Sequence, residues 1–463
     1  MPETLAGTLP PQTHTQTIDR RKALGKSLRE KCDRRSHATW SPAPDRRDPV
    51  EILIEQGTSR LQQLLPLRYA RMRVSPFAFL RGGAAVMTAD LAATPNSGLM
   101  VQAAGDCHCM NFGGFATPER RLVFDLNDFD ETAVAPWEWD LKRLAASFVV
   151  ATFDALDKDA RLDLARLVSS SYRTTMIDIA SKPVLESWYR GLVIDSAETA
   201  EAFGIGAPAI RKARDFLTHG NSIDIHRRPE TGMNVEPHIQ DEPPLVYHPT
   251  AEQAVAFEAA VKAMLVDYAT SLTPERRTLL ERYRRTDAAY KVVGVGSVGT
   301  MCGVVMMVSG SGEILNLQFK EATQSVLEPF AGPSPYAHHG ERVVRGQRLL
   351  QASSDILLGF GTGPTGRHIY VRQLRDAKVK PALETMSARH FRRYAATCGE
   401  ALARAHARTA DAVVLASYLG RGTAFDESTG AFAVAYGKQT EQDHAALEKA
   451  IKSGRLTASN DPS

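Results

Sequence analysis

One glycine-rich segment restricts the fold of this 463-residue chain more than any other feature. It runs from Lys291 to Thr300 and has the spacing Gly-x-Gly-x-x-Gly. A dinucleotide-binding fold requires a helix directly after such glycines. Here residues 301–308 are apolar and partly β-branched, which favours a strand instead. The sequence therefore predicts a glycine loop between two antiparallel strands, an arrangement in which loop backbone covers phosphate groups.

The second of these strands carries a lysine. The turn residues of 309–313 predict a hairpin, and residues 314–319 alternate between apolar and polar side chains. Lys320 continues the polar face, so we expect it to reach phosphates under the glycine loop. The candidate nucleotide-binding residues of this region are Gly294, Gly296, Ser297, Gly299 and Lys320.

An earlier segment has the residue types of a catalytic loop. Gly105-Asp106-Cys107-His108-Cys109-Met110-Asn111 follows a short apolar run that predicts a strand. Asp106 and Asn111 have the Asp-to-Asn spacing of a kinase catalytic loop. We expect Asp106 to accept the proton of an acceptor hydroxyl and Asn111 to offer its amide oxygen to Mg²⁺. His108, the second candidate catalytic residue, is expected to brace the loop by hydrogen bonds.

A second metal-binding carboxylate is expected shortly downstream. Residues 111–115 and 121–127 predict paired strands, and Asp128-Phe129-Asp130 follows them. Asp128 is favoured as the ligand because it begins an Asp-Phe pattern. Asp125 is the alternative, because its spacing from Asn111 is closer to that of ordinary kinases. So many carboxylates in one short segment repel each other unless a cation lies among them.

The two segments occur in the reverse of the kinase order, in which the glycine loop and lysine come first. We therefore expect an α+β, kinase-like, two-lobed fold that is circularly permuted. Such a permutation leaves the packed core unchanged if the new ends lie at the surface. The predicted strand 369–371 would lead into an adenine-binding linker at Gln373. For the partner of Lys320 we expect Glu341, with Glu328 as the alternative.

We divide the chain into five segments. Residues 1–48 are a basic, mobile or surface-wrapping arm, and 49–195 form the catalytic-loop half of a large helical lobe. Residues 196–287 are an insert of helices and loops that we expect to shape the acceptor pocket. The β-rich small lobe spans about 288–376, and 377–463 complete the large lobe as helices.

Composition excludes several classes of protein. A net charge of +3 is too small to indicate nucleic-acid binding by bulk electrostatics. No apolar run reaches the length of about 18 residues that a transmembrane helix needs, so no membrane partner is expected. The five cysteines are scattered and odd in number, which favours a reducing cytoplasm over a disulfide framework. The spacing of Cys107-His108-Cys109 is too tight for an ordinary zinc site.

Several segments together resemble one bacterial family, the domain-of-unknown-function family 2252. Besides the loops above, they are Ser75–Gly82, Trp139–Leu144, Val371–Asp376 and Leu402–Arg408. This family is similar to the aminoglycoside and choline phosphotransferases, whose loop reads Gly-Asp-x-His-x-x-Asn. The resemblance implies the roles given above for Asp106, His108, Asn111 and Asp128. It also implies that Asp140 holds the catalytic loop from below.

The late segment 402–408 carries three basic side chains at helical spacing: Arg404, His406 and Arg408. We expect them to lie on a solvated helix face, and binding of an anionic substrate is the alternative.

The function we expect is that of a cytoplasmic phosphotransferase that uses ATP and Mg²⁺ and acts on an unidentified hydroxyl acceptor. Two alternatives stay open. One is a nucleotide-binding pseudoenzyme with a regulatory role. The other is a metal-dependent hydrolase built on Asp106, His108, Asp125, Asp128 and Asp130.

Overall fold

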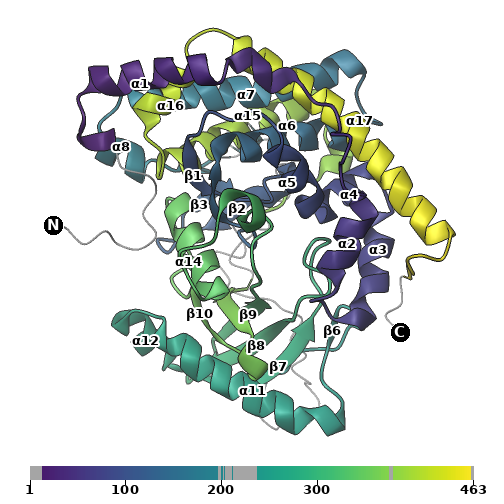
Figure 1. Cartoon of the computed structure of the whole chain (residues 1–463). Helices are drawn as coiled ribbons and strands as arrows, with labels where there is room; N and C mark the ends of the chain where they lie inside the picture. The colour runs from purple at the N-terminus through teal and green to yellow at the C-terminus, as the bar shows by residue number, and fades with distance from the viewer. Residues whose placement is uncertain are drawn as a thin grey trace.

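The computed structural model describes residues 13–196, 200–201, 203, 211, 237–374 and 379–459. It is a mixed α+β protein in which a body of helices lies against a six-stranded sheet (Figure 1). In the described part of the chain, no helix is both long and apolar enough to cross a bilayer.

The large sheet is antiparallel throughout, with the strand order β10-β11-β9-β8-β7-β6. Its strands are β6 (Val246–Tyr247), β7 (Tyr283–Lys291), β8 (Cys302–Ser309), β9 (Ile314–Glu321), β10 (Gly359–Thr362) and β11 (His368–Gln373). The predicted hairpin is confirmed, because β8 pairs with β9 from Cys302 opposite Lys320 to Val308 opposite Ile314. Lys320 is thereby placed beside the base of the glycine loop.

Helices cover both faces of this sheet. On one face, α11 (Ala251–Thr270) packs Met264 and Tyr268 against a cluster that includes Leu317 and Val371. Figure 1 shows α11 along the side of the sheet away from the helical body, followed by α12 (Pro274–Leu280). On the other face, α14 (His339–Leu350) joins Tyr370 in the core of the helical body. Neighbouring side chains of β11 therefore point to opposite faces of the sheet: Val371 packs in the core under α11, and Tyr370 packs in the core of the helical body.

The sheet begins earlier in the chain than the predicted boundary at 288. Strand β6, helix α11 and most of β7 precede that position, yet they belong to the sheet and its cover. Of the expected acceptor region 196–287, residues 197–199, 202, 204–210 and 212–236 lie outside the described residues.

The helical body is built around α6 (Trp137–Ala151), whose side chains from Trp137 to Val150 are all buried. A helix buried on every side lies in the centre of a core. Around it lie α7 (Lys158–Ala180), α15 (Ala388–Ala407), α16 (Ala412–Leu419) and α17 (Ala424–Lys452). Helices α6 and α7 are separated by residues 152–157.

Short helices and strands complete the body. The helices are α2 (Pro49–Gly57), α3 (Leu65–Met72), α4 (Pro76–Gly82), α5 (Ala84–Ala92), α8 (Val184–Tyr189) and α13 (Glu328–Ala331). The strands are β1 (Met100–Ala103), β2 (Phe112–Ala116), β3 (Leu122–Leu126), β4 (Ala133–Pro136) and β5 (Leu192–Val193). Strand β1 pairs with β4, and β2 pairs with β3 as predicted.

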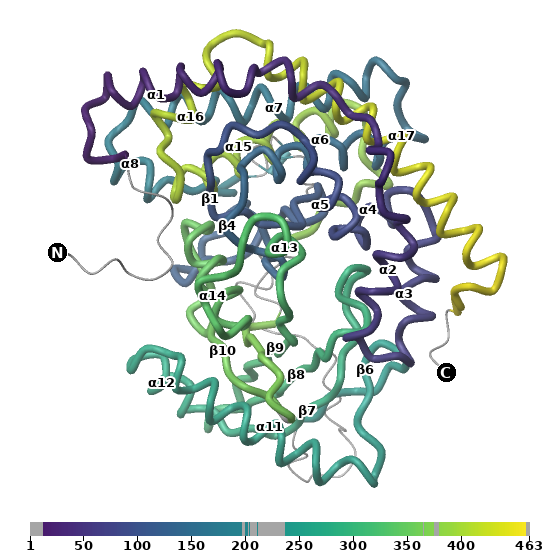
Figure 2. The backbone as a smooth tube through the Cα atoms, viewed as in Figure 1, coloured from purple at the N-terminus to yellow at the C-terminus, as the bar shows by residue number. Residues whose placement is uncertain are grey.

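The N-terminal segment wraps the body surface from residue 13 onward. Helix α1 (Ile18–Lys31) lies along α16, and the Arg29 side chain donates to the backbone oxygen of Tyr418 at 2.9 Å. Figure 2 shows α17, near the end of the chain, beside α2 and α3 near its beginning. Both ends of the described chain thus belong to the helical body, with the large sheet formed by the residues between them.

A buried ion-pair network joins this early segment to α17. Arg46 Nε donates to Asp90 on α5 at 2.7 Å, and its Nη2 donates to Asp443 on α17 at 2.6 Å. The Tyr436 hydroxyl donates to Asp90 at 2.8 Å. Although burial lowers the pKa of the Arg46 guanidinium, its bonds with the two carboxylates raise it overall.

Replacing Arg46 by Ala is expected to destabilise the fold strongly, because it leaves two buried carboxylates without their cation. Breaking a buried pair from one side costs about 3–5 kcal/mol. Urea unfolding followed by circular dichroism measures the loss. The matched control is Arg47→Ala, whose ion pair with Glu55 is exposed and should change stability by less than about 0.5 kcal/mol. Equal losses of stability in the two variants would show that the buried ion pairs of Arg46 do not stabilise the fold.

Candidate functional site

The loop between β1 and β2, which the sequence predicts to be catalytic and which keeps the name catalytic loop below, is held by a chain of buried side chains. The Asp140 carboxylate, in the first turn of α6, accepts the backbone N–H groups of Ala104 at 2.6 Å and Gly105 at 3.0 Å. His406 Nε2 lies 3.1 Å from the same carboxylate, and Tyr172 contacts His406 Nδ1 at 2.9 Å. Asp140 therefore supports the loop as expected. His406 is fully buried, so its expected place on a solvated face is wrong.

Gly105 allows the loop to approach the acidic segment closely. It has a φ of +86°, and a Cβ there would lie 2.3 Å from the backbone oxygen of Glu131. Only glycine combines the left-handed backbone with this approach. The loop and the acidic segment are thereby packed backbone to backbone.

One oxygen of Asp106 is bonded and the other faces the cleft. Arg143 donates to Oδ1 from Nε at 2.9 Å and also from Nη2. Oδ2 lies 3.7 Å from His108 Nε2, and a Cβ on Gly296 would lie 3.9 Å from it. Burial raises the pKa of Asp106, and the charge of Arg143 opposes that rise.

The two other predicted residues of this loop lie beside Asp106. The Asn111 amide donates to the Asp106 backbone oxygen at 2.6 Å, which directs its own oxygen elsewhere. His108 Nδ1 accepts the Met110 N–H at 3.2 Å, so His108 braces the loop as predicted. Burial lowers the pKa of His108 well below its usual value, and the imidazole is neutral.

Lys320 reaches the acidic wall of the cleft from the sheet and lies behind Asp130, which lines the cleft. Its Nζ lies 2.5 Å from Asp130 Oδ2 and 3.8 Å from Asp128 Oδ1, and the side chain is 3 % exposed. Tyr370 donates to Asp130 at 2.5 Å and Ser297 at 3.1 Å. Burial raises the pKa of Asp130, but Lys320 and Tyr370 lower it to about 2 overall. The acidic segment and the lysine, far apart in sequence, therefore meet.

The partner expected for Lys320 is wrong. Glu341 pairs with Arg345 at 3.3 Å, and Glu328 lies 3.6 Å from Arg342. Arg342 points from α14 toward the acidic segment and donates to the backbone oxygen of Asp130 at 2.8 Å. The helix thus contributes a cation to this region where a glutamate was expected.

Asp128 has the free oxygen that a metal ligand needs. Its Oδ1 is buried without a hydrogen-bond partner among the residues that the structure describes. Burial and the Asp130 charge raise the pKa of Asp128, while Lys320 lowers it. In the described ranges, no three His, Cys, Asp or Glu side chains converge as a metal site.

Four predicted residues do not line the cleft: Lys320, which lies behind Asp130, and Asp125, Gln373 and Gly299. Asp125 faces a separate pocket with Trp188, Arg404 and Arg408, and burial raises its pKa to about 7. Gln373 ends β11, where its N–H donates to Asp355 at 2.5 Å. Gly299 does not line the cleft, although its φ of +92° shapes the glycine loop.

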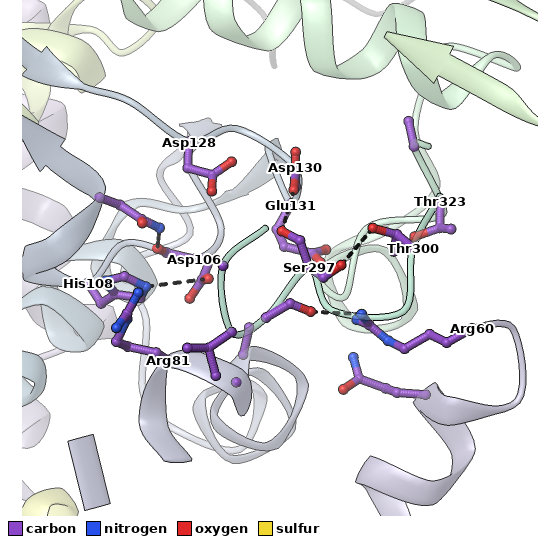
Figure 3. Close-up of a pocket in the computed structure, with 18 of the residues that line it drawn as sticks. Arg60, Arg81, Asp106, His108, Asp128, Asp130, Glu131, Ser297, Thr300 and Thr323 are labelled. Atoms are coloured by element: carbon purple, nitrogen blue, oxygen red, sulfur yellow. Dashed lines mark hydrogen bonds and ion pairs between the residues drawn. The ribbon is translucent and has the colours of Figure 1, made fainter. Parts of the chain in front are cut away.

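The glycine loop closes over the catalytic loop. Arg60 donates to the backbone oxygens of Gly296 at 2.8 Å and Val298 at 2.7 Å, and Arg71 donates to that of Gly294 at 2.5 Å. Figure 3 shows Ser297 beside Asp130 and Glu131, with Asp106 close by. The cavity left between the loops measures about 80 Å³, whereas ligand pockets measure about 300–1,000 Å³. A ligand as large as a nucleotide does not fit while the glycine loop lies in this position.

Sequence reasoning missed some residues of this cleft. The cleft is also lined by Arg60, Arg81, Asp130 and Glu131, and Arg143 and Tyr370 bond its carboxylates. Asp130 was expected only as a ligand of the alternative hydrolase. Arg81 and Arg143 lie in segments that carry the family resemblance, but no role was assigned to them. Arg60, in a bend after α2, had no signal.

A sequence profile of one bacterial family, described as an uncharacterized protein conserved in bacteria (DUF2252), matches residues 60–450. The chain belongs to this family. The match begins after the N-terminal segment and includes both the catalytic loop and the glycine loop. No curated protein and no solved structure matches the chain.

Gly105→Ala is expected to destabilise the protein more than Gly98→Ala does. Both glycines have positive φ, which costs a substituted side chain roughly 1–2 kcal/mol. Only at Gly105 does the new Cβ also meet backbone, since nothing lies within 4 Å of a Cβ at Gly98. Thermal unfolding of the two variants measures the difference. Equal unfolding midpoints would contradict the close packing of the two loops.

Proposed function

We propose that this protein is an ATP- and Mg²⁺-dependent phosphotransferase that acts on a hydroxyl acceptor. The observation that carries the proposal is the position of Lys320 Nζ, 3.8 Å from Asp128 and 2.5 Å from Asp130 under the glycine loop. Phosphoryl transfer needs cations on the phosphates, oxygen ligands for Mg²⁺ and a carboxylate near the acceptor. The carboxylates and the Asn111 amide line one cleft, and Lys320 lies directly behind Asp130, one of the lining residues.

The order of elements in the sheet supports a kinase-like, circularly permuted, two-lobed fold. The glycine loop joins β7 to β8, Lys320 lies on the third strand β9, and α14 follows. A kinase small lobe has the same sequence of parts. The catalytic loop and the acidic segment come earlier in the chain, from the helical body.

The residues present fit a bound Mg²⁺. The Asp128 Oδ1 atom is buried without a donor in the described part of the chain, and the Asn111 amide nitrogen is engaged, which leaves its oxygen. Both are hard oxygen ligands of the kind that Mg²⁺ prefers. When bound, the metal neutralises the charge of the transferring phosphate.

The remaining roles belong to the chain itself. Arg143 fixes Asp106 through Oδ1, so that Oδ2 is left to take the proton of the acceptor hydroxyl. Lys320 and the backbone N–H groups of the glycine loop hold the phosphates. When the loop lifts to admit nucleotide, Ser297 has to release Asp130. All five cysteines are buried free thiols, which supports a cytoplasmic location.

A nucleotide-binding pseudoenzyme with a regulatory role is the second candidate, because it would use the same cleft without phosphoryl transfer. The hydrolase alternative loses support because Asp125 faces another pocket.

Lys320→Met is expected to weaken binding of ATP·Mg²⁺ about 10- to 100-fold, because a charge-assisted bond to phosphate contributes about 1.5–3 kcal/mol. Isothermal titration calorimetry with AMP-PNP and Mg²⁺ measures the affinity, and a thermal melt verifies folding. Lys262→Met removes a lysine from the exposed side of α11 and should leave the affinity unchanged. If the native protein does not bind AMP-PNP·Mg²⁺, the proposed function is refuted.

Asp106→Asn is expected to retain nucleotide affinity and to lose turnover about 10²- to 10⁴-fold, as removal of a general base does. Release of ADP in the presence of a metabolite extract measures turnover, and Asp163→Asn on the exposed side of α7 is the control. Native turnover in the Asp106 variant would refute its assigned role. A native protein that binds nucleotide but never releases ADP would favour the pseudoenzyme.

A further inference from the structure

Arg81 is a cation in the cleft that has no carboxylate partner. It lies in the last turn of α4, and its guanidinium lies 5.9 Å from the centre of the Phe77 ring. Its Nε is buried without a hydrogen-bond partner, and no ion pair to it occurs in the part of the chain that the structure describes. A buried donor without an acceptor costs about 1–3 kcal/mol. This unmet donor distinguishes Arg81 from the other cleft arginines.

The other arginines are engaged. Arg143 is bonded to Asp106 and to the backbone oxygen of Leu80, and Arg60 is bonded to two glycine-loop oxygens. Their positions are explained by the fold itself. Arg81 reaches the cleft with nothing among the described residues to bind there.

Lys380 is a second cation, and its charge acts on both His108 and Asp128. Its neighbour Val379 exchanges backbone hydrogen bonds of 2.7 and 2.9 Å with Gly114 on β2, which holds this segment against the catalytic loop. Burial lowers the pKa of His108, and the charges of Arg81, Arg143 and Lys380 lower it further. Lys380 is exposed and makes no ion pair within the described residues. The charges of two cations without an ion pair among the described residues therefore act on His108, that of Arg81 more strongly than that of Lys380. On Lys380 itself, the charge of Asp128 acts more strongly than that of Arg81.

The position of Arg81 separates it from the proposed phosphate side of the cleft. In Figure 3, Arg81 lies beside His108 on one side of Asp106, and Asp128 lies on the other. Lys320 and the acidic segment belong to the Asp128 side. A group held by Arg81 would thus reach Asp106 from the side opposite the nucleotide, where an acceptor has to lie for in-line transfer.

We propose that the acceptor is an anion: a hydroxyl compound with a carboxylate or phosphate group, which Arg81 and Lys380 bind while its hydroxyl lies at Asp106. The planar guanidinium matches both groups in a bidentate geometry, and Lys380 adds a point charge. This inference rests on the proposed function, since it assigns the substrate class of the same site. A neutral or cationic acceptor would leave both cations unpaired.

Inorganic phosphate and acetate test the site without knowledge of the acceptor. Calorimetric titration of each anion, at constant ionic strength and with saturating AMP-PNP·Mg²⁺, measures binding outside the nucleotide site. Binding of phosphate indicates an acceptor with a phosphate group, and binding of acetate indicates an acceptor with a carboxylate. We expect at least one anion to bind, and Arg81→Gln and Lys380→Gln each to weaken it about tenfold or more.

Three controls separate the effect of the anion site from effects of total charge, side-chain geometry and misfolding. Lys262→Gln removes an equal charge from exposed α11 and should change nothing. Arg81→Lys keeps the positive charge but loses the planar guanidinium, so it should retain part of the anion binding that Arg81→Gln loses. AMP-PNP affinity and the thermal midpoint of each variant should stay native, which excludes misfolding as the cause.

The outcomes separate this inference from the proposed function. Anion binding that is native in Arg81→Gln, or absent for both probes, overturns the anionic subsite while nucleotide binding stands. Anion binding that competes with AMP-PNP overturns it as well, because Arg81 would then serve the nucleotide. If AMP-PNP does not bind but phosphate or acetate still needs Arg81 and Lys380, the anion site stands and the phosphotransferase proposal fails.

Discussion

The ion pair between Lys320 and Asp130 is the contact on which the site depends. It joins side chains 190 residues apart in the sequence, one from the large sheet and one from the acidic segment of the helical body. Burying two charges is costly unless they meet in good geometry with further hydrogen bonds. Tyr370 and Ser297 supply those bonds to Asp130. The sheet, the acidic segment and the glycine loop are thereby held at one point.

The catalytic loop is positioned by a different set of contacts, all within the helical body. Asp140 on α6 accepts two loop N–H groups, and His406 on α15 and Tyr172 on α7 extend the chain of hydrogen bonds. The cleft therefore has one wall fixed by buried polar groups and another formed by a loop of glycines.

Much of the local structure followed from the sequence. The period-two alternation before Lys320 and the glycine-serine turn predicted the β8–β9 hairpin, and the spacing of Asp106, His108 and Asn111 marked the loop that the structure places in the cleft. The partners in the ion pairs could not be predicted from the sequence. Glu341 was expected at Lys320, but it lies on α14 beside Arg345, one helical turn away. A near neighbour on a helix is available to pair whatever the fold, whereas a distant partner depends on it.

By itself, the sequence determined where strands, turns and the two loops form, because these depend on side-chain periodicity and backbone preferences over a few residues. Only the tertiary structure decided which charges meet: Asp130 with Lys320, Asp106 with Arg143, Asp125 in a pocket of its own, and Arg81 with no anion among the described residues. Electrostatic pairing acts across space between elements that are remote in sequence, and it leaves no local pattern from which a partner can be predicted.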